Sequence, residues 1–201
     1  MNYHKVKKLF REIWHFIWEE ESILSWIVNV ILAFILIKYV VYPGLGFILA
    51  TSHPIVAVVS GSMEHNNKFN EWWPLQESYY LGYNISKQDF VEYKFKNGFN
   101  IGDIMILKGK KPGKIQLGDV IVFNGNRQDP IIHRVIKTWK ENDKYYFQTK
   151  GDNNPRSMSA LESRIHEDNV IGYAVIRVPL LGYIKIWFVE LLKLFSLVGG
   201  V

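Results

Sequence analysis

Four short segments of the chain carry the residues with the clearest chemical potential: residues 60–64 (SGSME), 118–123 (GDVIVF), 131–135 (IIHRV) and 150–154 (KGDNN). Taken singly, each has an ordinary structural explanation, as a turn, a strand, a histidine with a satisfied ring or an Asx-rich loop. Together they supply a serine hydroxyl, which needs a base within hydrogen-bond reach, and a histidine, the side chain whose ordinary pKa suits that base. The combination predicts nucleophilic catalysis by a serine.

His133 is the histidine that lies in the company this chemistry needs. The others lie ahead of a long apolar segment, flank the serine motif in loops, or lie in a charged stretch; they are His4, His15, His53, His65 and His166. We therefore expect His133 to act as the general base.

An acid on the second ring nitrogen would fix the tautomer of His133 and stabilise its imidazolium. Asp152 is the preferred candidate, because it follows His133 by 19 residues, in a turn that can return beside the preceding strand. Glu162 is the alternative, although its placement depends on ten further residues that include Pro155. In a third interpretation Asp152 belongs to a structural Asx turn, and Ser62 and His133 act as a dyad.

The elements that must position these residues are short β-strands. Apolar runs cut by Gly, Asp, Asn and Pro occur at residues 55–59, 104–107, 120–123, 131–136, 145–149 and 170–177. No alternation of strands with helical patterns appears, which argues against a parallel α/β sheet. The expected fold class is mainly β, with an extracytoplasmic domain over residues 42–178.

The region ahead of this domain has the composition of a membrane anchor. Residues 1–22 place apolar side chains at helical spacing opposite a basic side, which is typical of an interfacial amphipathic helix, although packing on its own domain would give the same pattern. Residues 23–41 are apolar except for Ser25, Asn29 and Lys38. At about 1.5 Å per residue this segment matches the roughly 30 Å core of a bilayer, and it is too long for a signal-peptide core. We expect a retained transmembrane anchor.

Charge asymmetry predicts the orientation of the anchor. Four basic residues precede the span, and no Lys or Arg occurs from Tyr42 to Asn67. The positive-inside rule then places the N-terminus in the cytoplasm and the β-domain on the outer face of the cell membrane.

Two further segments have unusual compositions. The stretch at about 66–100 is rich in aromatic residues, which predicts either a small subdomain with its own core or a rim that contacts headgroups or an extended substrate. The segment 179–201 is apolar but carries Lys185, Glu190 and Lys193, which favours an interfacial or domain-packed helix over a second transmembrane helix.

Composition excludes several functional classes. A chain of 201 residues that is 48% hydrophobic is not disordered. The net charge of +5 is scattered among acids, which argues against nucleic acid as a partner. The absence of Cys excludes thiol nucleophiles and zinc–cysteine sites, and no cluster has metal-ligand spacing, so we expect no metal or organic cofactor.

In their order, directly after an outward-pointing anchor, these motifs resemble those of type I signal peptidases, specifically the archaeal and endoplasmic-reticulum branch with a histidine base. The resemblance covers roughly Val56 to Val175, plus the anchor. It implies that Ser62 is the nucleophile and His133 the base. It also implies that Ser60 helps to build an oxyanion hole with main-chain N–H groups, including that of Ser62.

The chain departs from the family pattern in three places. His65 stands where the family usually has Pro, and Met158 stands where this branch commonly has a second aspartate. The insertion at about 66–100 also exceeds that of most relatives. Because Met158 cannot supply a carboxylate, the acid that partners His133 is either Asp152 alone or Glu162.

The resemblance implies a membrane-bound serine endopeptidase that removes signal peptides from exported proteins and prefers small residues before the cut. A shallow substrate pocket would be lined by Ile55, Val56, Val58, Met63, Ile131 and Ile132. The implied partners are signal-peptide-bearing preproteins and the lipid bilayer, with the protein-export machinery as a further candidate.

Two rival functions fit parts of the sequence. One is a self-cleaving, repressor-type Ser–Lys protease on the related fold, which the anchor and a histidine at the position of the base argue against. The other is a non-enzymatic, membrane-anchored β-domain that binds peptides or glycans through its aromatic insertion. A turnover assay separates an enzyme from this binding module.

Overall fold

The computed structural model describes residues 3–66, 68–125, 127, 129–184, 187 and 190. It divides the chain into two compact units, Met1–Ile48 and Leu49–Val201. Each unit is described by itself below.

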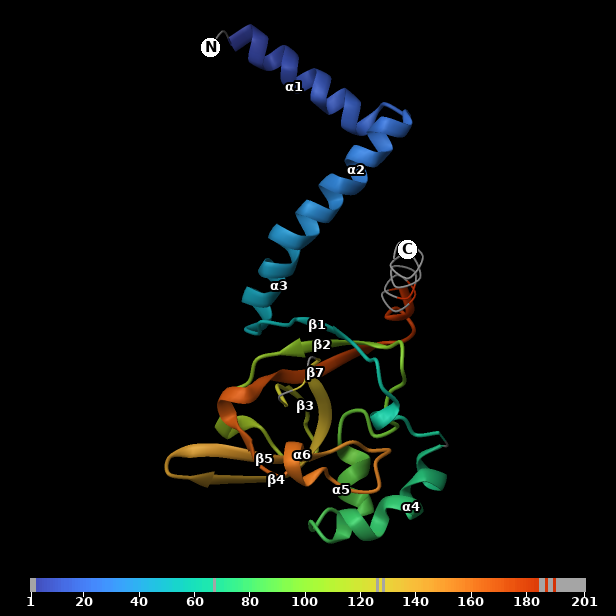
Figure 1. The fold of residues 1–201 in the computed structure, drawn as a ribbon, viewed down its shortest axis with the longest axis vertical. Helices are drawn as coiled ribbons and strands as arrows, with labels where there is room; N and C mark the ends of the chain where they lie inside the picture. The colour runs from blue at the N-terminus through green and yellow to red at the C-terminus, as the bar shows by residue number, and fades with distance from the viewer. Residues whose placement is uncertain are drawn as a thin grey trace, which may run out of the picture. The chain divides into compact units, whose positions relative to one another are not determined.

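The first unit is helical. It contains α1 (Tyr3–Trp18), α2 (Ile23–Leu36), a π-helical turn (Ile37–Val41) and α3 (Tyr42–Leu49) (Figure 1). Ser22 caps α2 by accepting a hydrogen bond from the main-chain N–H of Ser25. The wider π-helical turn precedes Pro43, which lacks an N–H and would interrupt regular helical hydrogen bonding. The helical path therefore continues to Leu49, beyond the expected end of the apolar span at Val41.

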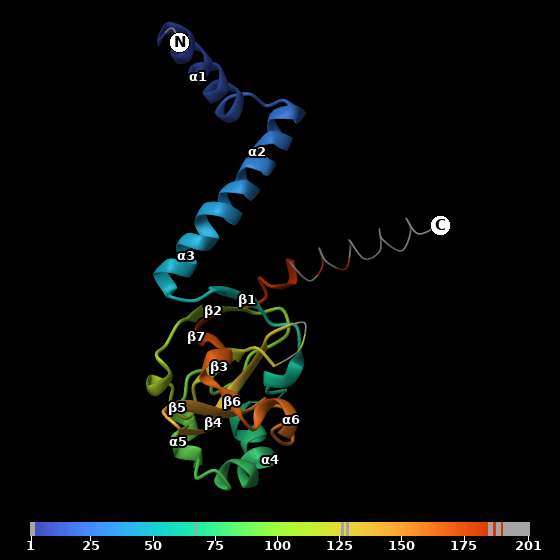
Figure 2. The same ribbon diagram turned by 60° about the vertical axis from the view of Figure 1, so that its left-hand side comes forward.

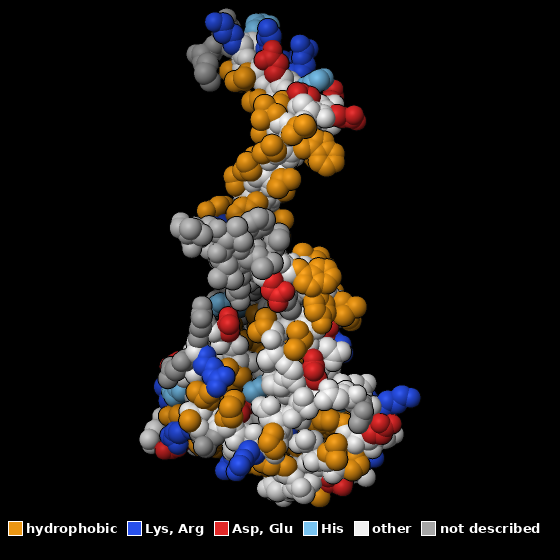
Figure 3. All heavy atoms as spheres, turned by 45° about the vertical axis from the view of Figure 1, so that its right-hand side comes forward, with side chains coloured by type: hydrophobic (Ala, Val, Ile, Leu, Met, Phe, Trp, Pro, Cys, Tyr) orange, Lys and Arg blue, Asp and Glu red, His pale blue; other side chains and the backbone are white. Residues whose placement is uncertain are grey.

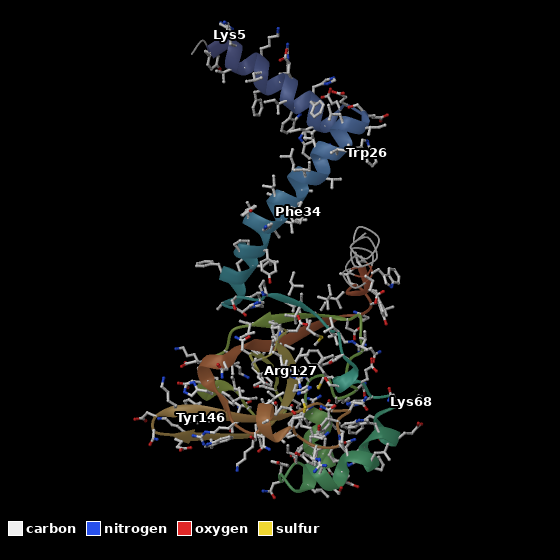
Figure 4. All side chains as sticks on the ribbon, viewed as in Figure 1. Lys5, Trp26, Phe34, Lys68, Arg127 and Tyr146 are labelled. Carbon is white, nitrogen blue, oxygen red and sulfur yellow. The ribbon has the colours of Figure 1, made fainter. Side chains whose placement is uncertain are left out.

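The continuous helix Ile23–Leu49 is long and apolar enough to cross a membrane. Hydrophobic side chains cover its visible surface, whereas charged side chains gather on α1 (Figure 3). Trp26 and Phe34 project outward from α2 and are 68% and 63% exposed (Figure 4). Large exposed apolar side chains of this kind are expected for a surface that faces lipid.

Two of the polar residues in the apolar segment have a structural role. Ser25 Oγ donates a hydrogen bond to the carbonyl oxygen of Phe16 at 2.6 Å, and Asn29 Nδ2 donates one to that of Ile17 at 2.8 Å. Both carbonyls lie in the last turn of α1, where helical partners run out. These bonds fix the corner between α1 and α2.

The second unit is built on a seven-stranded sheet, which confirms the mainly β fold class. The strands are β1 (Ile55–Ala57), β2 (Ile104–Lys108), β3 (Val120–Phe123), β4 (Ile131–Glu141), β5 (Lys144–Lys150), β6 (Ile165–His166) and β7 (Val170–Val178). Their order in the sheet is β1-β2-β7-β3-β4-β5-β6, and all neighbouring pairs are antiparallel. The longest pairing is the β4–β5 hairpin, whose turn residues Asn142 and Asp143 both have positive φ.

The central strand β3 is buried on both faces. Val120 and Val122 belong to one hydrophobic cluster, and Ile121 and Phe123 belong to another. Alternate residues of a strand point to opposite faces, so one short apolar run contributes to two cores. This explains why the strand carries no polar residue.

The aromatic insertion forms α4 (Phe69–Leu81) and α5 (Lys87–Glu92). A third hydrophobic cluster lies here, with Trp72, Trp73, Tyr80, Ile85 and Phe90 packed against Ile136 of β4. Trp72 and Trp73 are only 3% and 1% exposed, so they are core residues and not a rim. In two views, α4 and α5 lie together at the end of this unit opposite β1 and β2 (Figures 1 and 2). The insertion thus has the arrangement of a small subdomain with its own core.

The C-terminal helix expected over residues 179–201 lies largely outside the described residues, which end in this region at 184 with 187 and 190 beyond.

Candidate active site

Ser62 lies on a tight turn at the end of the segment that follows β1. Ser60 has extended backbone, and residues Gly61–Met63 form a single 3₁₀ turn. A Cβ at Gly61 would lie 2.9 Å from Glu64 Oε2, so glycine leaves room for that carboxylate. Glu64 in turn accepts a hydrogen bond from the main-chain N–H of Ile101 at 2.9 Å. The turn is therefore held from its C-terminal side and presents Ser62 at its tip.

His133 lies on β4, opposite Ile121 of the buried strand β3. Its Nε2 is 2.9 Å from Ser62 Oγ, and the residue is 3% exposed. The hydroxyl can donate its proton to this nitrogen without any rearrangement. The structure thus brings together the serine and the histidine that the sequence singles out.

Glu162 occupies the other side of the imidazole. It ends the four-residue helix α6 (Ser159–Glu162) and hydrogen-bonds through Oε1 to His133 Nδ1. Thr149 donates to the same oxygen at 3.2 Å, and the main-chain N–H of Met158 donates to Oε2 at 2.6 Å. Both carboxylate oxygens of this fully buried residue are therefore fixed.

The preference for Asp152 as the partner of His133 requires correction. Its Oδ1 accepts hydrogen bonds from Arg134 Nε and Tyr80 Oη, both at 2.9 Å. Its Oδ2 accepts from Arg134 at 2.7 Å and from His65 Nε2 at 3.1 Å. His133 and Arg134 are consecutive in β4 and so point to opposite faces of the sheet. A carboxylate that pairs with Arg134 therefore lies on the face away from the imidazole.

The electrostatics of Asp152 agree with a structural ion pair. Burial alone would raise the pKa of this carboxyl, but the charge of Arg134 and the hydrogen bonds from His65 and Arg134 outweigh it and hold the pKa well below its usual range. Burial, followed by the negative charge of Asp152, raises the pKa of the Tyr80 hydroxyl well above its ordinary value. Tyr80 therefore donates its hydrogen bond to an ionised carboxylate.

The loop of residues 150–154 lies directly against the serine turn. Asn153 donates hydrogen bonds from its main-chain N–H to the Ser62 carbonyl oxygen at 2.8 Å and from Nδ2 to that of Gly61 at 2.9 Å. A Cβ at Gly151 would lie 2.8 Å from both His133 Nε2 and the Ser62 carbonyl oxygen. Ser60 Oγ is 3.2 Å from Ser62 Oγ. A second hydroxyl thus lies next to that of Ser62.

A hollow of about 760 Å³ opens beside Ser62 and His133. Its wall includes Ile131 and Ile132 of the expected pocket, and also Ala57, Val59, Met158 and the labelled Arg127 (Figure 4).

The expected pocket requires a correction on β1. Val58 and Met63 are buried in a core cluster, and Val56 packs against the same cluster. Ile55 is on the same face of β1 as Ala57 but does not line the described hollow. Residues alternate between the two faces of a strand, so Ala57 and Val59 face the hollow where Val56 and Val58 were expected.

Several residues around the site were not among those singled out from the sequence. Arg134, Tyr80 and Thr149 hydrogen-bond to the two carboxylates, and His65 was noted only as a departure from a motif. One signal was available: Arg134 is a charge inside an apolar strand, and such a residue is almost never fully buried unless it is paired. No sequence signal identified its partner.

The class of this protein follows from comparison with known proteins. No family model matches the chain. The curated relatives are nevertheless catalytic subunits of a signal peptidase, so the chain is similar to the archaeal and endoplasmic-reticulum branch of type I signal peptidases that its motifs indicated.

The relatives are catalytic subunits named SEC11 of the signal peptidase complex in Saccharomyces cerevisiae. The proteins of strains YJM789 and RM11-1a are each 29% identical to this chain over 179 residues, which covers 81% of this chain and 87% of the yeast protein. The similarity therefore extends over most of both chains.

Proposed function

We propose that this chain is a membrane-bound serine endopeptidase that removes signal peptides from exported proteins by cutting after small residues. The observation that carries the proposal is the hydrogen-bonded series from Ser62 Oγ through both ring nitrogens of His133 to Glu162. The similarity to signal peptidase catalytic subunits supports the substrate class.

Catalysis begins with proton transfer from Ser62 Oγ to His133 Nε2. The oxygen attacks the scissile carbonyl carbon, and the resulting oxyanion accepts hydrogen bonds from the Ser62 main-chain N–H and the Ser60 hydroxyl. His133 then donates the proton to the departing amine, which leaves an ester on Ser62. A water molecule gives a proton to His133 and attacks this ester. His133 then returns the proton to the Ser62 oxygen as the ester bond breaks, which releases the carboxylic acid product and regenerates the serine hydroxyl.

Glu162 is the acid in this mechanism, in place of Asp152. It accepts the Nδ1 proton of His133, which leaves Nε2 free to act as a base in the neutral ring. When the ring becomes charged, the buried carboxylate stabilises it. The bonds from Thr149 and Met158 hold Glu162 in place for both steps.

Small residues before the cut fit the hollow beside Ser62. Its apolar wall includes Ala57, Val59, Ile131 and Ile132, and the last two occupy consecutive positions before His133. A wall of branched side chains leaves room for short substrate side chains and excludes long ones.

The helical unit supports a topology in which α1 lies at the cytoplasmic surface and Ile23–Leu49 crosses the cell membrane. The side chains of Phe10, Trp14 and Trp18 are exposed and contact one another in series, and Lys7 and Arg11 lie beside them at helical spacing. Aromatic and basic side chains together bind the headgroup region of a bilayer. The catalytic unit then lies on the outer face, where preproteins emerge from the export machinery.

The non-enzymatic alternative is not favoured. A surface that binds glycans or peptides through aromatic rings needs those rings exposed, whereas the largest rings of the insertion are buried in its core. The similarity to catalytic subunits argues in the same direction.

The test is cleavage of a signal-peptide-bearing preprotein by the purified full chain in liposomes, followed by N-terminal sequencing of the product. We expect one cut after a small residue, lost in His133→Ala. Absence of cleavage by the wild type, or cleavage that persists in His133→Ala, would contradict the proposed function.

A further inference from the structure

The insertion leaves and rejoins the chain beside the catalytic serine. It departs after His65 and returns at Gly98–Ile101, where the main-chain N–H of Phe99 donates to the Met63 carbonyl oxygen at 3.0 Å. Gly98 has φ +67°, and a Cβ there would lie 2.3 Å from the same carbonyl oxygen. The returning segment therefore packs directly against the turn that carries Ser62.

The middle of the insertion contacts the loop of residues 150–154. Tyr80 of α4 donates its hydroxyl to Asp152, and Lys150 Nζ donates to Gln76 Oε1 of α4 at 2.9 Å. The same ammonium group donates to the carbonyl oxygens of Gly151 and Asp152, both at 3.1 Å. Gln76 and Tyr80, one helical turn apart on α4, therefore hold this loop in place through hydrogen bonds.

Arg134 connects the loop, the sheet and the insertion. Besides its paired hydrogen bonds to Asp152, it donates to the carbonyl oxygens of Lys94 and Phe95, each at 2.9 Å. Its guanidinium carbon lies 4.6 Å from the centre of the Phe90 ring. Since Arg134 and Asp152 are fully buried, the two bonds between them form where water does not compete.

His65 completes the same cluster. Its ring stacks on Trp72 with centroids 3.7 Å apart, and its Nε2 hydrogen-bonds to Asp152. The residue that replaces the family's proline therefore links the serine turn to the core of the insertion.

We propose that the aromatic insertion is a scaffold for the catalytic centre, in which Tyr80 and Gln76 are positioning residues that act on Ser62 through the loop of residues 150–154. The last link is the pair of hydrogen bonds from Asn153 to the carbonyl oxygens of Ser62 and Gly61. This inference rests on the proposed function and assigns a role to a segment that touches no reacting atom.

Positioning has a distinct kinetic signature. A displaced nucleophile slows the chemical step. The wall residues Ala57, Ile131 and Ile132 belong to β1 and β4 and keep their places, while the loop of residues 150–154 contributes Asn154 to the lining. Misplacement by about 1 Å can cost on the order of a hundredfold in rate. We therefore expect a loss in kcat with little change in KM.

The test compares Tyr80→Phe with Tyr83→Phe in the full chain, reconstituted in liposomes. Each change removes one hydroxyl of the insertion that hydrogen-bonds to a residue outside the insertion. The Tyr80 hydroxyl bonds to Asp152 of the loop, whereas the Tyr83 hydroxyl accepts from Gln148 of β5 at 2.9 Å. Tyr80→Phe should lower kcat roughly tenfold with KM within about twofold, and Tyr83→Phe should leave both nearly unchanged. Equal effects of the two variants, or a Tyr80→Phe loss confined to KM, would overturn the proposal.

A second pair of variants covers the case in which Tyr80→Phe fails to fold. Gln76→Ala removes the acceptor of Lys150, whereas Glu77→Ala on the same helix removes the acceptor of Trp73, a bond internal to the insertion. Gln76→Ala should lower kcat several-fold more than Glu77→Ala. The reverse order would reject the scaffold.

Hydrogen exchange separates this proposal from the proposed function. Amides of residues 60–64 and 150–154 should exchange faster in Tyr80→Phe than in Tyr83→Phe, with or without turnover by the wild type. Wild-type inactivity with this exchange pattern would reject only the peptidase assignment. Unchanged exchange in an active enzyme would reject only the scaffold.

Discussion

Glu162 hydrogen-bonds to Nδ1 of His133 across 29 residues of sequence, from the last position of a four-residue helix. The helix starts after Met158, whose main-chain N–H also donates to Glu162. Met158, the position at which the resemblance led us to expect an aspartate, thus contributes its backbone here, and the carboxylate comes from Glu162, four residues further on.

This relationship predicts different consequences for the two acids. Glu162→Gln should leave the fold intact and lower kcat by up to about 10⁴-fold, because the amide cannot enforce the required tautomer of His133. Measurement of kcat and of the melting temperature on the same preparations checks this. Full activity in Glu162→Gln would remove the acid from the mechanism.

Asp152→Asn should act mainly on stability. The change leaves Arg134 buried without its charge partner, and breaking such a pair typically costs about 3–5 kcal/mol. We expect a large fall in the melting temperature that Glu162→Gln does not share. A stable Asp152→Asn variant with kcat reduced to the level of Glu162→Gln would instead return the acid to Asp152.

Lys150 should give the stability of the protein a distinctive pH dependence. Burial lowers the pKa of its ammonium group to about 8, although Asp152 opposes this. Between pH 8 and the ordinary lysine value near 10.5, the unfolded chain binds more protons than the folded chain, so stability rises with pH. The melting temperature of Lys150→Met relative to that of wild type should therefore fall across this interval. A relative melting temperature that rises with pH would contradict the assignment.

Gly151 should tolerate no side chain. A Cβ at this position lies 2.8 Å from His133 Nε2 and from the Ser62 carbonyl oxygen, so Gly151→Ala forces apart the two catalytic residues. We expect at least about a hundredfold loss of kcat. Gly44→Ala is the matched control, because nothing lies within 4 Å of its Cβ position. Comparable activity of the two variants would contradict this prediction, because it would show that the loop shifts to accommodate the added methyl group.

The topology can be tested by labelling, since the chain contains no cysteine. In right-side-out vesicles, a membrane-impermeant maleimide should react with Lys68→Cys and reach Lys8→Cys only after permeabilisation. Both positions are exposed (Figure 4 labels Lys68). The opposite labelling pattern would place the catalytic unit on the wrong side for processing exported proteins.

The strands were predictable because their signals are local. Apolar runs bounded by Gly, Asp and Asn reproduce β3 at its bounds and locate β2, β4, β5 and β7. Ser62 and His133 follow from the same signals, since each lies on or beside such a run. The sequence could not show the face each side chain occupies at the end of a strand, which is why Val56 and Val58 were expected in the hollow in place of Ala57 and Val59.

The acid was harder to predict because it depends on tertiary packing. Asp152 is nearer to His133 in sequence, but Arg134 and the buried insertion provide stronger partners for it. Those partners come from segments distant in sequence, and local sequence patterns do not indicate that these segments contact Asp152. The placement of Glu162 depends on one helical turn that only the folded chain defines.

The central claim is that Ser62 is the nucleophile, and the kcat of Ser62→Ala on a signal-peptide-bearing preprotein tests it most directly. The change removes one partly exposed oxygen, so the variant should remain folded and membrane-bound. Ser60→Ala serves as the comparison, because it removes only an oxyanion donor, typically worth about 3–4 kcal/mol in the transition state. We predict no measurable processing by Ser62→Ala and reduced, measurable processing by Ser60→Ala. Near-wild-type turnover by Ser62→Ala would contradict the account.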